Sequence, residues 1–76
     1  MKEILEVIIK NLVSNPEAVI IKEKNEERNI CYEVVVAEAD MGKVIGKQGK
    51  IAKSIRTVMK SVASKEHKRV TVEFLG

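Results

Sequence analysis

The sequence is poor in aromatic residues and has no long hydrophobic run. Among its 76 residues there is one Tyr, one Phe and no Trp. So few aromatic rings cannot form the platform on which some single-strand nucleic-acid binders stack several bases. No apolar stretch approaches the roughly 18 residues that a membrane-spanning helix needs. Glu3 and Glu6 also interrupt the first apolar segment, so we expect neither a membrane partner nor a signal peptide.

Cysteine and histidine are equally scarce, with Cys31 and His67 the single residues of their types. One cysteine cannot form an internal disulfide, and one Cys with one His cannot complete a metal site. A catalytic thiol would need a base beside it, and nothing in the sequence directs His67, which lies in a polar segment, toward Cys31. We therefore expect no metal, no cofactor, no small-molecule substrate and no enzymatic activity. The expected compartment is a reducing cytoplasm.

Acidic residues are missing from much of the second half of the chain. Residues 1–39 contain five basic and eight acidic side chains, whereas residues 40–76 contain nine basic and three acidic ones. Between Met41 and Lys65 there is no acidic residue. A sign split of this kind predicts a surface for a polyanion on the second half, although a lysine-rich helix can also be no more than a solvated face.

Apolar residues recur at helical spacing in two segments, residues 2–13 and residues 50–64. In the second segment, the basic residues Lys53, Arg56 and Lys60 lie opposite the apolar arc on a helical wheel. We expect the arc to pack and the basic stripe to face solvent, without any requirement that the stripe lie beside the preceding turn. The apolar arc consists of Ile51, Ile55, Val58, Met59 and Val62.

Three segments have the composition of β-strands. Residues 18–24 and 30–37 are rich in β-forming residues, and the five polar residues between them predict a hairpin. Alternate residues of the second segment fall on opposite faces. The more uniformly apolar of these faces holds Ile30, Tyr32, Val34 and Val36. Residues 70–74 alternate apolar and polar side chains and predict a third strand.

The remaining segment, between the second and third strands, predicts a short helix before the long one. Asp40 is placed to cap a helix over residues 41–45, and Gly46 is placed to end it. The order of elements is then αββααβ. This order predicts an α+β fold in a single domain, residues 1–76, with a three-stranded sheet packed against three helices.

The turn Gly46-Lys47-Gln48-Gly49 joins the two predicted helices. Glycine allows close approach of a ligand to the backbone and positive φ, and the N–H groups at a helix start suit a phosphate. A P-loop is excluded because Gly42 to Gly46 is one residue too short and Gln48 stands where a hydroxyl is required. A dinucleotide-binding fingerprint is excluded because its first glycine pair is absent and a helix precedes the turn. Glycines that serve only as helix caps remain the alternative.

The segment from Asp40 to Arg56, DMGKVIGKQGKIAKSIR, resembles the core of the KhpA family of small bacterial KH-domain RNA-binding proteins. The likeness extends over nearly the whole chain, including the Asn15-Pro16 break after the first helix and the Lys68-Arg69-Val70 entry into the last strand. The broad KH pattern has an aliphatic residue where this chain has Ala52. The resemblance implies a type II KH domain, in which a GxxG turn clamps the backbone of about four nucleotides.

By this resemblance, single-stranded RNA would lie in a groove between the turn and an edge of the sheet. Backbone amides of the turn would meet phosphate, and the neighbouring lysines would add charge. Three apolar residues beside the turn, Val44, Ile45 and Ile51, would either form a floor for bases or belong to the ordinary core. The expected RNA-binding residues are Gly46, Lys47, Gln48, Gly49, Lys43, Lys50, Val44, Ile45 and Ile51.

The resemblance also implies partners and a cellular role. KhpA proteins form homodimers and pair with a larger KH protein, KhpB. The implied role is that of an RNA chaperone or post-transcriptional regulator linked to cell division and elongation. The alternative is a KH-fold protein-interaction module that dimerises and has little RNA binding of its own.

Overall fold

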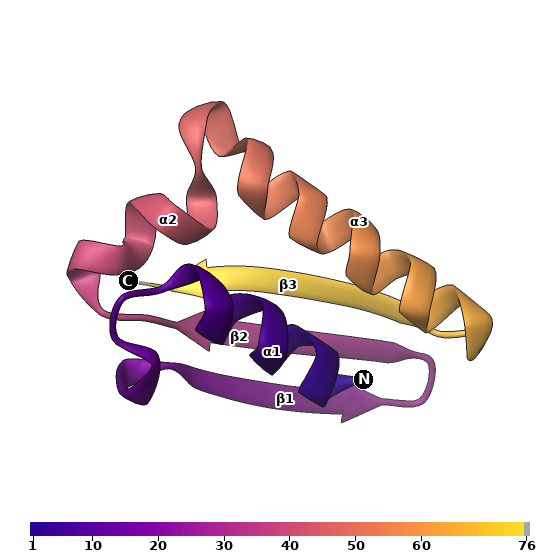
Figure 1. The fold of residues 1–76 in the computed structure, drawn as a ribbon. Coiled ribbons are helices and arrows are strands. Elements are labelled where there is room, and N and C mark those ends of the chain that lie inside the picture. Colours follow the sequence, from indigo (N-terminus) through magenta and orange to yellow (C-terminus); the bar gives the residue numbers. More distant parts are fainter. Residues whose placement is uncertain (76) are drawn as a thin grey trace.

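The computed structural model describes residues 1–75, which form three α-helices and three strands (Figure 1). Their order confirms the predicted αββααβ arrangement and the α+β class. Three short 3₁₀ helices, η1, η2 and η3, lie in the connections. In chain order the elements are α1 (Lys2–Leu12), η1 (Pro16–Ala18), β1 (Ile20–Glu26), β2 (Asn29–Val35), η2 (Glu38–Asp40), α2 (Met41–Ile45), η3 (Lys47–Gly49), α3 (Lys50–Lys65) and β3 (Arg69–Leu75).

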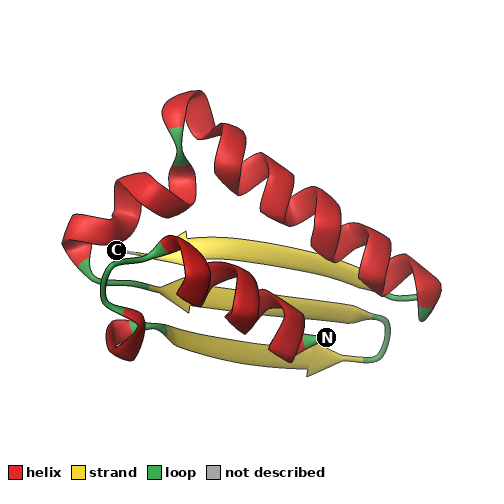
Figure 2. Cartoon of the chain, in the orientation of Figure 1, coloured by secondary structure: helices red, strands yellow, loops and turns green. Residues whose placement is uncertain are grey.

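The sheet has the strand order β1-β2-β3, and the helices cover one of its faces (Figure 2). β1 and β2 are antiparallel, whereas β2 and β3 are parallel. A parallel pair needs a crossover connection, and here α2, the glycine turn and α3 provide it. Because β3 is the last strand of the sheet, one of its edges stays free beside α3. No helix in residues 1–75 is both long enough and apolar enough to cross a membrane.

The core shows which face of β2 is buried, a point that the sequence left open. The alternate residues that form the more apolar face, from Ile30 to Val36, are at most 5% exposed. Leu5 and Ile9 of α1 pack onto them and are fully buried. The buried line of α3 consists of Ala52, Ile55, Met59 and Ala63.

Two members of the predicted apolar arc of α3, Val58 and Val62, lie outside the core cluster. Val58 is 45% exposed, because the line from Ala52 to Ala63 is the one that meets the sheet. The small side chains at both ends of that line allow the helix backbone to approach its neighbours. The apolar arc is therefore wider than the packed face, and part of it remains at the surface.

The hairpin between β1 and β2 is tighter than predicted. Instead of a five-residue loop, the strands continue to Glu26 and Asn29, which pair with each other across a two-residue turn. Polar side chains did not end the strands, because backbone hydrogen bonds hold a ladder whose side chains are solvated. At its other end β1 begins at Ile20 rather than residue 18, since η1 takes the residues after Pro16.

Asp40 does not cap α2 in the predicted way. Its carboxylate accepts hydrogen bonds from the N–H groups of Ser14 (3.0 Å) and Asn15 (3.1 Å), and makes no capping bond to α2. The residue has helical backbone angles (φ −97°, ψ −6°) instead of the extended angles that are usual for an N-cap. The carboxylate, only 2% exposed, thus ties the end of α1 to the beginning of α2.

Candidate nucleic-acid interface

The turn between α2 and α3 is built on left-handed backbone. Gly46, Gln48 and Gly49 have φ of 76°, 58° and 73°. Gly46 combines its φ with a ψ of 177°, a region that essentially only glycine adopts. A Cβ at Gly46 would also lie 2.5 Å from Cγ1 of Ile51, whereas a Cβ at Gly49 would meet nothing within 4 Å. The first glycine is therefore required by close approach as well as by φ.

Hydrogen bonds within the turn leave two of its amides free. The N–H of Gly46 donates to the carbonyl of Gly42 (2.9 Å), and the N–H of Gly49 donates to that of Gly46 (3.2 Å). The N–H of Lys50 donates to the carbonyl of Lys47. Among residues 1–75, the N–H groups of Lys47 and Gln48 have no such partner. Two adjacent free N–H groups beside a left-handed residue form a concavity suited to an anion.

The polar side chains in and beside the turn differ in whether another group of the protein already contacts them. Lys47, Gln48 and Lys50 are exposed, and neither lysine forms a salt bridge within residues 1–75. Lys43 instead lies 3.5 Å from the Asp40 carboxylate and hydrogen-bonds the Ser14 hydroxyl. Of the three predicted lysines, two are free for a ligand and one is held by the protein.

The Asp40 carboxylate is stabilised in its charged form. The hydrogen bond from the Ser14 N–H holds the pKa of Asp40 below its usual range, against the opposing effect of burial. The Asn15 N–H and the Lys43 ammonium act in the same direction. An ionised Asp40 therefore holds the start of α2, the helix that precedes the glycine turn, against the end of α1.

The three apolar residues proposed as a floor for bases do not form one surface. Val44 is fully buried in the core, which leaves no side-chain surface for a base. Ile45 and Ile51 are half-buried and pack against the core cluster. Their exposed parts are the apolar surface that the structure leaves beside the turn.

Arg56 is a candidate residue that the predicted site lacks. Its Nε donates a hydrogen bond to the carbonyl of Val72 on the free edge of β3 (3.0 Å), and its guanidinium lies 5.4 Å from the centre of the Phe74 ring. A small cavity of ≈ 220 Å³ between α3 and β3 is lined by Arg56, Lys60, Val70, Thr71 and Val72. Helical spacing places Arg56 on the basic stripe, but only the fold shows that the stripe overhangs the edge of β3.

The arrangement is suited to binding an anion. It combines two free amides, exposed lysines and an arginine held against a strand edge. Residues 1–75 contain no group of three or more His, Cys, Asp and Glu residues that could hold a metal ion.

A family described as "KhpA/KhpB, KH domain" matches residues 2–74. The chain belongs to this family. The match includes all three helices, the glycine turn and nearly all of β3. This match confirms the predicted family membership and the KH fold. The KhpA/KhpB KH-domain family is not a family of enzymes.

Full-length relatives agree with the KhpA/KhpB assignment. The chain is 56% identical to the RNA-binding protein KhpA of Clostridium acetobutylicum, over 99% of this chain and 100% of the relative. It is 55% identical to KhpA of Clostridium perfringens over the same shares of the two chains. KhpA of Listeria monocytogenes is 43% identical, over 99% of each chain.

Proposed function

We propose that this protein binds single-stranded RNA by its sugar-phosphate backbone, with the turn Gly46-Lys47-Gln48-Gly49 as the clamp. The observation that carries the proposal is the pair of free N–H groups on Lys47 and Gln48 at the tip of the turn. A phosphate oxygen would accept from both, while the Lys47 and Lys50 ammonium groups offset its charge. The names of the relatives, RNA-binding proteins, support RNA as the polyanion.

This clamp reads backbone more than sequence. Phosphate contacts position a nucleic acid without carrying sequence information, and Tyr32, one of the two aromatic residues, is fully buried. With two or three phosphates neutralised, the salt slope for a single strand is about −1.5 to −2. One domain then binds with a Kd of roughly 10⁻⁴ to 10⁻⁶ M, in the non-specific range.

Replacing Lys47 and Gln48 together with Asp tests the clamp. The two carboxylates would stand beside the free amides and repel phosphate, so RNA binding in a gel shift or fluorescence titration is expected to be lost. Circular dichroism is expected to stay unchanged, because both side chains are exposed. The matched control changes Lys10 and Asn11 of α1 to Asp, which alters the net charge by the same amount away from the turn. If the turn variant binds RNA as tightly as this control does, the clamp proposal is wrong.

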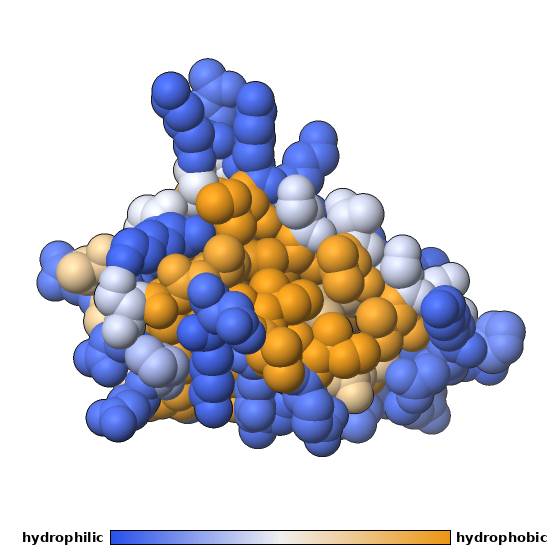
Figure 3. Space-filling view, viewed as in Figure 1, coloured by the Kyte–Doolittle hydropathy of each residue, from blue (hydrophilic) through white to orange (hydrophobic). Residues whose placement is uncertain are grey.

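We also propose that a second copy of the chain covers the apolar face of α1 and α3. Figure 3 shows this face as a broad hydrophobic surface. Val7 is 62% exposed and Val58 is 45% exposed. Two apolar hollows of ≈ 300 Å³ each meet at Ile8, one along α1 and the other between α1 and α3. A dimer would bring two weak RNA clamps together, and linked binding sites reinforce each other without new contacts.

Sedimentation of Val7→Glu and Val58→Glu tests the dimer. Both variants are expected to be monomeric, since a carboxylate would be desolvated in the interface. Thr57→Glu, one residue away on an exposed position of α3, is the control and should remain dimeric. A parent protein that stays monomeric alone but assembles when KhpB is added would assign the face to that larger partner. A dimer that binds no RNA would favour the alternative function, a protein-interaction module.

The cellular part of the proposal rests on the family resemblance. We infer a cytoplasmic RNA chaperone or post-transcriptional regulator that influences cell division and elongation. Cell length in a strain whose chromosomal copy carries the Lys47→Asp, Gln48→Asp change, compared with the Lys10→Asp, Asn11→Asp strain, tests this role. Equal cell lengths in the two strains would separate RNA binding from cell shape.

A further inference from the structure

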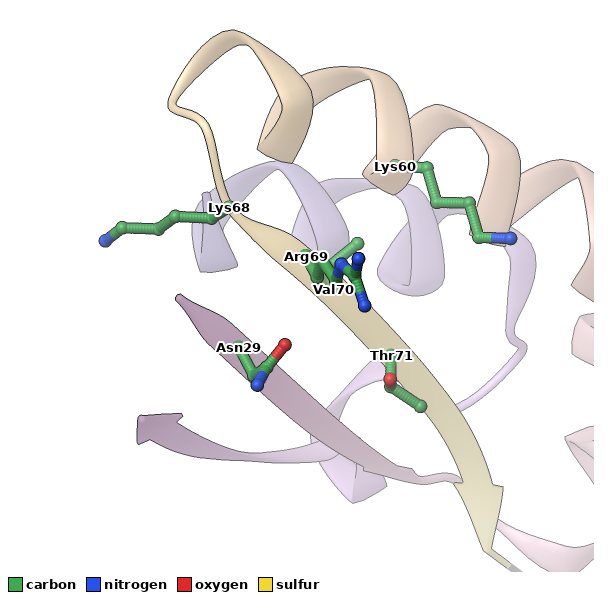
Figure 4. A pocket seen from close by; sticks show the side chains of 6 residues that line it. All are labelled: Asn29, Lys60, Lys68, Arg69, Val70 and Thr71. Carbon is green, nitrogen blue, oxygen red and sulfur yellow. The ribbon is translucent and has the colours of Figure 1, made fainter. Parts of the chain in front are cut away.

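A cavity lies at the end of α3 away from the glycine turn. It measures ≈ 460 Å³ and is lined by Asn29, Lys60, Lys68, Arg69, Val70 and Thr71. Figure 4 shows Lys60 reaching from α3, Arg69 and Thr71 rising from β3, and Asn29 standing on the neighbouring strand β2. The Lys68 ammonium points away from the other side chains in the same view.

The polar side chains of this cavity are mainly hydrogen-bond donors. Lys60 and Arg69 are exposed cations that form no salt bridge within residues 1–75. The Asn29 amide and the Thr71 hydroxyl add donors without negative charge. The acidic residues nearest in sequence are Glu27 and Glu66 in the adjoining turns and Glu73 on β3, and none of them lines the cavity. The balance favours an anionic ligand with several acceptor oxygens, as a phosphate has.

Backbone hydrogen bonds hold the walls of the cavity in place. The N–H of Arg69 donates to the carbonyl of Arg28 (2.7 Å), which joins the start of β3 to the β1–β2 turn. Asn29 and Arg69 are register partners across β2 and β3. At the end of α3, the N–H of Lys68 donates to the carbonyl of Ala63 (2.9 Å). Lys60 and Arg69 therefore project from fixed backbone on two different elements.

A basic surface connects this cavity with the glycine turn. Ten residues of helix separate Lys50 from Lys60, which corresponds to about 15 Å along the axis. Arg56 lies between them against β3, and the smaller cavity beside it shares Lys60, Val70 and Thr71 with the larger one. An RNA strand that is bound at the glycine turn and runs along the free edge of β3 would contact Arg56 first and Lys60 afterwards.

We propose that Lys60 and Arg69 bind a backbone phosphate of the RNA strand that the glycine turn clamps. This phosphate lies outside the segment of about four nucleotides that a KH turn binds. This inference rests on the proposed RNA clamp. The RNA-binding surface then extends along the whole free edge of α3 and β3, from the glycine turn at one end to the cavity at the other. The protein then binds long single strands more tightly, and with a steeper salt dependence, than short ones.

An RNA length series tests the second site. The probes are uridine oligonucleotides of about four and about twelve nucleotides, within the range of single-strand site sizes, titrated over a range of salt concentrations. For the parent protein, the salt slope should be steeper with the long RNA by about 0.7, the value for one further neutralised phosphate. Lys60→Ala, Arg69→Ala should remove that increase and leave binding of the short RNA unchanged. Lys10→Ala, Lys22→Ala removes the same charge from α1 and β1 and should retain the increase.

The outcomes separate this site from the clamp itself. Equal slopes for short and long RNA in the parent protein, or an undiminished increase in Lys60→Ala, Arg69→Ala, would overturn the second site and leave the clamp standing. A parent protein that binds neither RNA would overturn both proposals. The comparison of the two RNA lengths in the unmodified protein does not depend on how any variant folds.

Discussion

The two ends of α3 are both joined to left-handed residues, but for different physical reasons. Before the helix, Gly46 adopts a conformation reserved for glycine, and its missing Cβ leaves room for Ile51. After the helix, His67 has a φ of 57° and closes the helix with bonds from its own N–H and that of Lys68 to the last turn. Close approach, rather than positive φ alone, makes a glycine indispensable.

This difference also separates the two proposed RNA contacts. At the glycine turn, ligand groups come from the backbone, so the sequence must contain the residues that shape the backbone. At the far cavity, ligand groups come from Lys60 and Arg69 side chains on separate elements. No local pattern is needed there. The first contact is consequently visible as a motif, and the second depends on how α3 and β3 pack.

Replacing Gly46 with Ala gives the largest expected effect on stability. The new Cβ would lie 2.5 Å from Cγ1 and 2.8 Å from Cβ of Ile51. Strained backbone and overpacking each cost about 1–3 kcal/mol, so we expect the free energy of unfolding in urea to fall by about 3 kcal/mol. Gly49→Ala, which meets no neighbour, should lose only about 1 kcal/mol through its positive φ. Equal losses in the two variants would show that Ile51 does not distinguish the glycines.

The fold could be predicted from the sequence where a periodic pattern decides it. Helical spacing indicated α1 and α3. The alternation from Ile30 to Val36 distinguished two faces of β2, and the more uniformly apolar one is the buried face in the structure. The hairpin was misjudged, because the pairing of Glu26 with Asn29 depends on backbone bonds that side-chain polarity does not report.

The candidate site could be predicted in part, and its details required the folded chain. The glycine spacing identified the turn, but the distribution of its hydrogen bonds restricts the free amides to Lys47 and Gln48. Lys43 and Asp40 both contact Ser14, which lies more than twenty residues earlier in the sequence. Local sequence patterns do not predict such long-range contacts. Arg56 belonged to a stripe expected to face solvent, and its place on Val72 depends on the position of β3.

Asp40→Asn tests how much the carboxylate that joins the end of α1 to α2 stabilises the segment before the glycine turn. The amide retains the shape of the carboxylate but offers one acceptor oxygen where the Ser14 and Asn15 N–H groups each meet a different one. It also removes the charge beside Lys43. We expect the midpoint of thermal unfolding to fall by less than it does in Gly46→Ala. An unchanged midpoint would mean that the bonds to Asp40 are replaced by water without loss.

The same carboxylate predicts a pH dependence. Because the folded pKa of Asp40 is depressed, the folded state favours the ionised form, and this stabilisation is fully present above the ordinary value of 3.8. It is lost as the pH falls through the lower folded pKa. The free energy of unfolding of the parent protein should therefore decline below about pH 4 more steeply than that of Asp40→Asn. Parallel curves for the two proteins in acid would assign the decline to other carboxylates.

His67→Gly is expected to have the smallest effect, and one of opposite sign. The bonds of the His67 and Lys68 N–H groups to the carbonyls of Ser64 (3.0 Å) and Ala63 (2.9 Å) form the helix-ending motif in which glycine is usual. Relief of the left-handed strain outweighs the greater freedom of glycine in the unfolded chain, so stability should rise by about 0.5–1 kcal/mol. His67→Ala keeps the strain and should show no gain. A loss of stability in His67→Gly would mean that the imidazole makes a contribution of its own, and the contrast between the two ends of α3 would then be one of side chains rather than of backbone.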